Sequence, residues 1–149
     1  MKTLVVYDSL HGNTERIAKA IGDALTGEVE VLRVGEVDPS EVKTLDLLFV
    51  GSPTHGGRAS PAMREFLGKV QAPALEGTNV AAFDTRLSTR WVGIFGYAAG
   101  RIAKSLKKKG GILVLSPQAF YVKGTEGPLK EGELERAAAW ATEIVQSAT

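Results

Sequence analysis

The chain has 149 residues, 44% of them hydrophobic, and its 18 basic and 17 acidic residues leave a formal net charge of +1. This length suits one hydrophobic core, so we expect residues 1–149 to form a single domain. The nearly balanced charge argues against nucleic-acid binding, and the lack of a long apolar segment argues against membrane insertion. The absence of cysteine excludes thiolate chemistry, and the N-terminus shows no signal-peptide pattern, so we expect a cytoplasmic protein.

Apolar runs and helical periodicities alternate along the chain. A buried strand is expected at residues 4–6, and apolar residues recur at helical spacing over residues 17–25. The pattern then predicts a strand at 28–34, a helix start near 38–41, a strand at 47–50, a helix at 61–70, a strand at 80–83, a helix at 94–108, a strand at 112–115 that is followed by an apolar run at 119–122, and a helix at 133–146. Five strands alternating with helices predict an α/β fold, a doubly wound parallel sheet with helices on both faces.

The turn at residues 9–15, Ser-Leu-His-Gly-Asn-Thr-Glu, joins the first strand to a helix N-terminus. Free N–H groups and the positive end of the helix dipole favour an anion there, and Ser9 and Thr14 add hydroxyl donors. The turn lacks the lysine of a nucleoside-triphosphate loop and the three glycines of a dinucleotide fingerprint, and without cysteine it is no phosphatase loop. The alternative is that Ser9 or Asn13 only caps the helix and that Gly12 only turns the chain.

This turn resembles the phosphate loop of flavodoxins, whose usual form is Ser/Thr-x-Thr-Gly-Asn-Thr-Glu, with His11 in place of a threonine. His11 removes one hydroxyl donor and offers an imidazole instead. Length and strand spacing extend the resemblance over essentially the whole chain. The resemblance implies a flavodoxin-like five-stranded sheet of order 2-1-3-4-5, with FMN as the cofactor. In flavodoxins FMN binds at the carboxyl ends of the strands, at the point where the strand order reverses.

The turn after the third strand resembles the second flavin loop of the family. His55 occupies the position where many flavodoxins carry a tryptophan against the flavin ring, and it can still stack. Gly56 and Gly57 would let a peptide reorient to accept a hydrogen bond from the flavin N5, because this motion needs φ values that a Cβ atom forbids. An ordinary turn would also explain both glycines.

The turn after the fourth strand, from Asp84 to Trp91, matches the third flavin loop by position only. Backbone N–H groups around Thr85 and Arg86 would meet the pyrimidine edge of the ring. Trp91 either stacks on the flavin or covers the next helix.

The resemblance therefore implies a cofactor site built from three loops, with no catalytic side chain because the flavin does the redox chemistry. The two histidines fall on neighbouring loops but lack a third ligand, so we expect no metal. The cofactor-binding residues expected are Ser9, Leu10, His11, Gly12, Asn13, Thr14, Pro53, Thr54, His55, Gly56, Gly57, Asp84, Thr85, Arg86 and Trp91.

Two functions follow from this site. The first is a monomeric one-electron carrier between redox protein partners, and the alternative is an FMN-dependent NAD(P)H:quinone-type oxidoreductase, so whether the chain is a stand-alone enzyme stays open. A receiver domain would need acidic residues that are missing, and no Gly-x-Ser-x-Gly elbow of a hydrolase is present. Arg58, Arg86 and Arg90 bring positive charge to the loops, which would either favour the fully reduced flavin or bind an acidic partner or a pyridine nucleotide.

Overall fold

The structure, a computed structural model, describes residues 1–88 and 97–148. The strands are β1 (Lys2–Tyr7), β2 (Glu28–Arg33), β3 (Leu47–Pro53), β4 (Asn79–Leu87), β5 (Ile112–Leu113) and β6 (Gln118–Val122). The helices are α1 (Asn13–Asp23), α2 (Pro61–Lys69), α4 (Ala98–Lys108) and α5 (Glu133–Ala148), with short 3-10 helices η1 (Val34–Glu36) and η2 (Pro39–Thr44). No helix in the described ranges is both long and apolar enough to cross a membrane.

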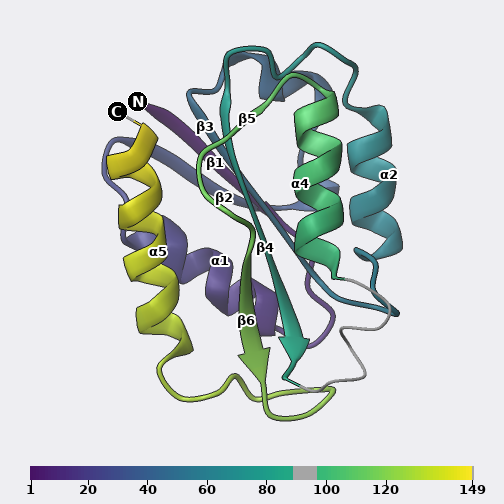
Figure 1. The fold of residues 1–149 in the computed structure, drawn as a ribbon, viewed down its shortest axis with the longest axis vertical. Helices are drawn as coiled ribbons and strands as arrows, with labels where there is room; N and C mark the ends of the chain where they lie inside the picture. Colours follow the sequence, from purple (N-terminus) through teal and green to yellow (C-terminus); the bar gives the residue numbers. More distant parts are fainter. Residues whose placement is uncertain (89–96, 149) are drawn as a thin grey trace.

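The strands form one parallel sheet in the order β2-β1-β3-β4-β5, and β6 also pairs with β4. Helices α1 and α5 cover one face of this sheet, and α2 and α4 cover the other (Figure 1). The predicted α/β fold and the strand order 2-1-3-4-5 are therefore confirmed. In this topology the loops after β1 and β3 diverge to opposite faces of the sheet, which leaves a crevice at the carboxyl ends of the strands.

The fifth position of the sheet is shared by two short strands instead of one continuous strand. Ile112 pairs with Asn79 at the start of β4, whereas β6 pairs with the end of β4. Pro117 lies between them, and a proline has no N–H to donate to a ladder. The predicted strand at 112–115 is thus wrong in length, and the apolar run at 119–122 continues the same sheet position toward the carboxyl edge.

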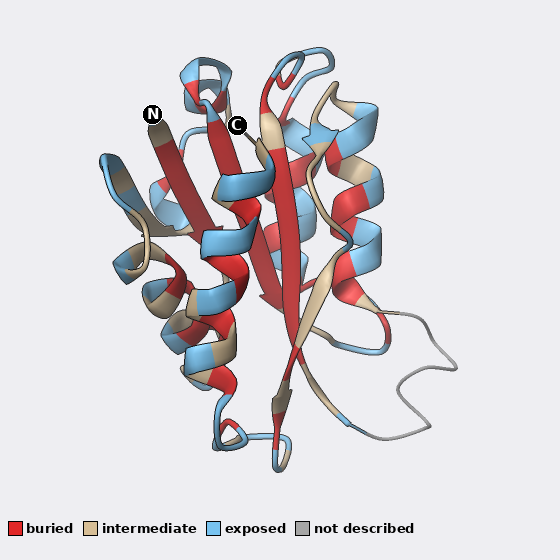
Figure 2. Cartoon of the chain, turned by 60° about the vertical axis from the view of Figure 1, so that its left-hand side comes forward, coloured by how far each residue is buried: buried red, intermediate tan, exposed pale blue. Residues whose placement is uncertain are grey.

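Central strands are buried on both faces, as Figure 2 shows by their continuous red colour. In β3, Leu48 and Val50 belong to the core under α2 and α4, while Leu47 and Phe49 belong to the core under α1 and α5. Successive side chains of a strand point to opposite faces, so an uninterrupted apolar run is what a doubly covered strand needs.

Trp140 of α5 is the centre of the core under α1 and α5. Its ring packs edge to face on Phe49, Phe83 and Phe120, with ring centroids 5.6, 6.1 and 5.9 Å away. Aromatic pairs in this geometry stabilise a core by about 0.5–1.5 kcal/mol each beyond the burial of their surface. The cluster attaches α5 to three strands that end at the carboxyl edge.

Helix α4 begins later than its periodicity predicts. Tyr97 has an extended backbone, with φ −137° and ψ 146°, so the helix starts at Ala98 and the prediction that Tyr97 is helical is wrong. The first predicted residues, 94–96, lie outside the described residues. The first N–H groups of the helix donate to the side chains of Thr54, which follows β3, and of Asp84 in β4, and periodicity does not reveal such acceptors.

Candidate functional site

A cavity of about 140 Å³ opens at the carboxyl ends of the central strands. It is bordered by the loops after β1, β3 and β6 and by the last residues of β4. The lining residues include most of the predicted site: Ser9, Leu10, His11, Asn13, Thr14, Pro53, Thr54, His55, Thr85 and Arg86, together with Leu87, Val122 and Thr125. Sequence positions more than a hundred residues apart are thus brought to one place.

The N-terminus of α1 borders this cavity without a side-chain cap. Its N-cap residue is Gly12, with φ +89°, and no side chain of the described residues accepts a hydrogen bond from the first helical turn. The backbone N–H groups of Asn13, Thr14 and Glu15 consequently have no acceptor within the described part of the chain. Neither Ser9 nor Asn13 acts as the helix cap that the alternative interpretation required. Uncapped N–H groups and the helix dipole together make a binding place for an anion.

Gly12 itself does not offer its N–H to the cavity. This N–H donates to the Ser9 hydroxyl oxygen over 3.0 Å, and the binding of a cofactor by Gly12 stays a prediction. The hydroxyl proton of Ser9 is left to donate elsewhere, because the oxygen acts here as an acceptor.

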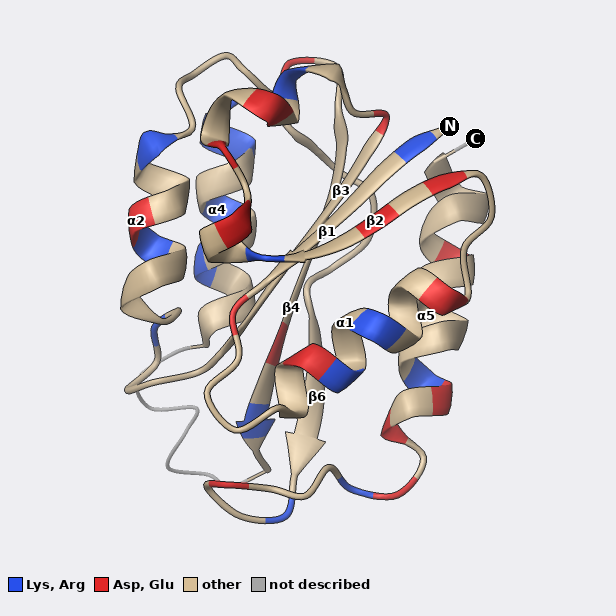
Figure 3. Ribbon diagram, turned by 180° about the vertical axis from the view of Figure 1, so that it is seen from behind, with Lys and Arg blue, Asp and Glu red and all other residues tan. Residues whose placement is uncertain are grey.

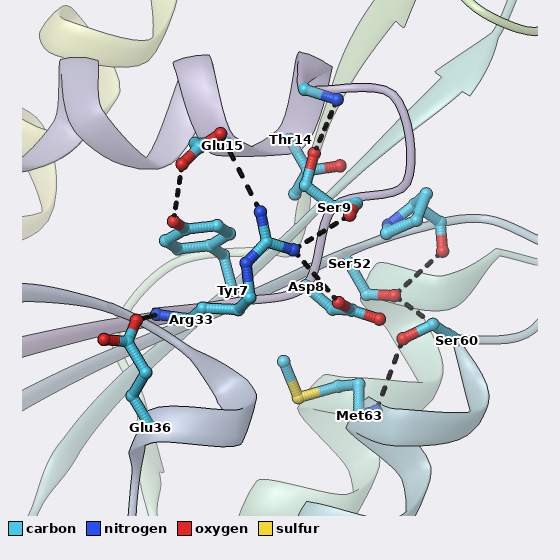
Figure 4. A network of polar contacts seen from close by, with 12 residues as sticks. Tyr7, Asp8, Ser9, Thr14, Glu15, Arg33, Glu36, Ser52, Ser60 and Met63 are labelled. Carbon is cyan, nitrogen blue, oxygen red and sulfur yellow. Dashed lines mark hydrogen bonds and ion pairs between the residues drawn. The ribbon is translucent and has the colours of Figure 1, made fainter.

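Arg33, from β2, fixes the start of this loop (Figure 4). Its Nη1 donates to the carbonyl oxygen of Ser9 over 3.0 Å and lies 3.7 Å from a carboxylate oxygen of Asp8, while Nη2 lies 3.8 Å from Glu15. The Tyr7 hydroxyl donates to the other oxygen of Glu15 over 2.8 Å. This hydrogen bond is the largest effect that lowers the pKa of Glu15, and burial followed by the same bond raises the pKa of Tyr7. Arg33 was not singled out from the sequence, because nothing in its local pattern indicates the loop it contacts.

Two threonines meet inside the cavity. The hydroxyl oxygens of Thr14 and Thr85 lie 2.7 Å apart, and both residues are buried. Only one of the two hydroxyl protons can be used between them, so the other can be donated to a bound group. The carbonyl oxygen of Thr85 accepts from the N–H of Thr54 over 3.0 Å, which ties the second loop to β4.

The second loop makes a two-residue turn beside the cavity. His55 and Arg58 exchange backbone hydrogen bonds of 2.8 and 3.0 Å, and the residues between them, Gly56 and Gly57, have φ values of +54° and +81°. Positive φ at both central positions favours glycine, as in an ordinary two-residue turn of this kind, and the reorientation of a peptide toward a flavin N5 stays a prediction. The carbonyl oxygen of Gly57 accepts from Arg101 of α4 over 2.8 Å, and His55 is left exposed at the cavity rim. Gly56 and Gly57 shape the rim but do not line the cavity.

Asp84 lies behind the cavity and does not line it. Its fully buried carboxylate accepts two hydrogen bonds from Arg86, at 2.8 and 2.7 Å, and one from the backbone N–H of Ala99 over 2.8 Å. The guanidinium of Arg86 also stacks on the ring of Tyr97, with its central carbon 3.4 Å from the ring centroid. The positive charge that Arg86 brings to this loop is therefore paired with the Asp84 carboxylate. Arg90 and Trp91 lie outside the described residues.

The loop after β6 is the part of the site that the sequence analysis missed. Thr125 and Val122 line the cavity, and the Asn13 amide donates to the carbonyl oxygen of Glu126 over 3.2 Å. The signal was available in the topology, because a fifth strand beside β4 must end at the same edge of the sheet as β1 and β3.

The donor set suits a phosphate group. No Asp or Glu is among the described residues that line the cavity, whereas hydroxyl, amide and imidazole groups are. Small-molecule pockets usually reach roughly 300 Å³, so this cavity can enclose only part of a ligand as large as a flavin nucleotide. Among the residues described, no group of three or more His, Cys, Asp or Glu side chains is placed to hold a metal ion.

Comparison with known proteins places this geometry in a family. The sequence model of that family, described as flavodoxin, matches residues 5–140. A flavodoxin from Aquifex aeolicus is 38% identical over 73 residues, which are 46% of this chain and 40% of that protein. The chain spans about half the length of the curated relatives that it matches.

Solved structures are similar over the whole chain. Oxidised flavodoxin 2 from Bacillus cereus superimposes with a TM-score of 0.82 at 25% identity, covering 98% of this chain and 99% of that one. A flavodoxin from the domain Archaea gives a TM-score of 0.81 at 24% identity and covers 99% of each chain. At 24% identity, the similarity to the archaeal flavodoxin shows the fold alone.

Proposed function

Because this chain belongs to the flavodoxin family, we propose that it binds FMN and carries single electrons between redox protein partners. We propose further that the protein is a monomer, that it forms a single domain and that it works in the cytoplasm. The observation that carries it is the uncapped N-terminus of α1, where three backbone N–H groups without an acceptor among the described residues border a cavity free of carboxylates.

The phosphate group of FMN would be held by the first turn of α1 together with side chains of the first loop. Ser9 and Thr14 supply hydroxyl groups, and His11 and Asn13 line the same cavity. Arg33 keeps the loop in this shape by donating to the carbonyl oxygen of Ser9. A phosphate bound by a helix N-terminus needs no lysine beside it.

The carboxyl ends of β3 and β4 would frame the flavin ring. Thr54 and His55 line the cavity on the side of β3, and Thr85 and Arg86 line it at the end of β4. The cavity is too small for a whole flavin nucleotide, so the ring system would extend from its mouth past the exposed His55. When bound, FMN supplies the redox chemistry, while the protein supplies binding and orientation.

Reconstitution with FMN followed by stepwise reduction tests this function. The protein should retain FMN through gel filtration as a monomer, accept two electrons from dithionite in two separate spectral steps, and oxidise no NADPH on its own. Rapid bleaching of the bound FMN by NADPH would favour the reductase over the carrier. A failure to retain FMN would overturn the cofactor assignment.

A further inference from the structure

A second and larger hollow lies away from the candidate site, between α2 and α4. Its volume is about 610 Å³, and its floor is apolar, formed in part by Leu67, Ala72 and Ile102. We call this hollow the basic groove, because its lining includes six cationic side chains: Arg58, Arg64, Arg101, Lys104, Lys108 and Lys109. Figure 3 shows basic residues on both helices that border it.

The residues that line the basic groove supply positive charges without acidic side chains to balance them. No Asp or Glu is among the described residues that form it, although six of the eighteen basic residues of the chain lie there. The rest of the chain is left with an excess of acidic residues. Within the described ranges, Lys104, Lys108 and Lys109 take part in no salt bridge, and the nearby Glu65 is paired with Lys69 on α2 at 3.0 Å.

The cations are spread along the groove instead of gathered at one point. Arg101, Lys104 and Lys108 follow one another at positions i, i+3 and i+7 of α4, which places them on one face over about 10 Å of helix axis. A mononucleotide concentrates its charge on adjacent phosphates. A line of single charges over an apolar floor is matched better by carboxylates that are spaced along a protein surface.

The basic groove is continuous with the rim of the candidate site. Arg58, at the end of the second-loop turn, lines the groove, while His55 at the start of the same turn lines the cavity. Arg101 connects the two regions, since it lines the groove and donates to the carbonyl oxygen of Gly57 in this turn. A protein seated in the groove would therefore reach the edge of the candidate site.

We propose that the basic groove docks an acidic surface segment of the redox partner protein. This inference rests on the proposed electron-carrier function and adds the chemistry of the partner and the face it uses. The partner would place acidic side chains beside the α4 cations and apolar side chains on the floor between the two helices. Rim charges of this kind mainly speed association and make it sensitive to salt.

Binding of an acidic probe peptide tests the groove without flavin or partner. The probe is a fluorescein-labelled peptide of four Glu-Glu-Leu repeats, and its affinity is measured by fluorescence anisotropy at low ionic strength. The double variant Lys104→Glu/Lys108→Glu should bind it about ten-fold more weakly than the unmodified protein, because two attractive charges become repulsive. The matched control Lys43→Glu/Lys123→Glu, which changes the net charge equally at exposed positions outside the groove, should stay within about two-fold.

Two results would overturn the docking proposal. One is an equal loss in both double variants, which would show that only net charge matters. The other is displacement of the peptide by micromolar NADPH, which would make the groove a nucleotide site. Thermal unfolding verifies that each variant is folded. FMN uptake is measured separately, so a chain that binds the peptide but no FMN would contradict the proposed function and leave the groove result standing.

Discussion

Helices α1 and α4 both begin at the carboxyl edge of the sheet, yet their N-termini differ. The N–H groups of Ala98 and Ala99 in α4 donate to the Thr54 hydroxyl over 3.2 Å and to the Asp84 carboxylate over 2.8 Å. In α1 the corresponding groups have no acceptor in the described part of the chain. The N-terminus of α4 therefore contributes to the stability of the fold, whereas the N-terminus of α1 is open to a ligand.

The open end of α1 gives up stability that a cap would supply. A glycine at the N-cap, such as Gly12 in α1, typically leaves a helix only roughly a few tenths of a kcal/mol less stable than a Ser, Thr, Asn or Asp cap does. Part of that loss is offset by Glu15, an acidic residue in the first turn that Tyr7 and Arg33 hold in place. A bound phosphate would supply the remainder.

Removing the charge of Asp84, which caps α4, should cause the largest change in the free energy of unfolding. The variant Asp84→Asn leaves the guanidinium of Arg86 buried without its partner, so we expect the free energy of unfolding to fall by about 3 kcal/mol. Urea denaturation measures this loss. The control Asp38→Asn changes an exposed cap of η2, where asparagine caps about as well as aspartate, and should lose far less stability. Equal losses in the two variants would refute the role assigned to Asp84.

At α1, a new negative charge should weaken FMN binding without harming the fold. We compare His11→Asp with His11→Asn, which have nearly the same shape and differ in charge. The Asp variant should bind FMN at least about ten-fold more weakly than the Asn variant, because one unit of charge near the phosphate costs on the order of 1–2 kcal/mol. The flavin-free Asp variant should be equally stable or about 0.5 kcal/mol more stable, since an acid favours a helix N-terminus. Isothermal titration calorimetry and urea denaturation give the two quantities, and equal FMN affinities would argue against a phosphate at α1.

Loss of the second cap of α4 should have a smaller effect on stability. The variant Thr54→Val removes the acceptor of the Ala98 N–H, and we expect the flavin-free protein to lose about 1 kcal/mol of unfolding free energy. Thr142→Val, at an exposed position of α5, should stay within about 0.5 kcal/mol of the unmodified protein. A change at Thr54 no larger than that at Thr142 would show that α4 does not depend on this cap.

The smallest expected effect is a pH dependence at α1. The pKa of Glu15 is lowered from its ordinary 4.5 in the folded protein, so its ionised form stabilises the fold above that pH, and the contribution is lost as the pH falls through the folded pKa. Glu15→Gln should therefore lose less stability than the unmodified protein when the pH is lowered from 6 to 3. The exposed Glu143→Gln serves as the control. An unchanged acid response in Glu15→Gln would contradict the role of the Tyr7 and Arg33 contacts.

The layout of the fold was predictable because it depends on local patterns. Uninterrupted apolar runs such as residues 47–50 indicate strands that are buried on both sides, and Ser60 and Pro61 indicate a helix start that the structure confirms. The last helix follows the same rule, since Ala137, Ala141 and Ile144 keep helical spacing on the buried face of α5, whereas the burial of Trp140 on that face was not predicted.

Partners distant in sequence were not predictable in the same way. Asp84 caps a helix that begins fourteen residues later in the chain, and Arg33 binds a loop carbonyl twenty-four residues before it. Such contacts depend on which side chains meet across the sheet, and neither period nor composition encodes that. The loops after β1 and β3 and the end of β4 were predicted by topology and resemblance, whereas the loop after β6 was missed. The binding of FMN by these residues stays a prediction.

The most direct measurement compares the affinities of FMN and riboflavin, which differ only in the phosphate group. Fluorescence quenching of each flavin on titration with the protein gives both dissociation constants. If the open end of α1 binds the phosphate through several charge-assisted hydrogen bonds, FMN should bind at least about 100-fold more tightly than riboflavin. Equal affinities would show that the first turn of α1 is no phosphate site and would contradict the central claim.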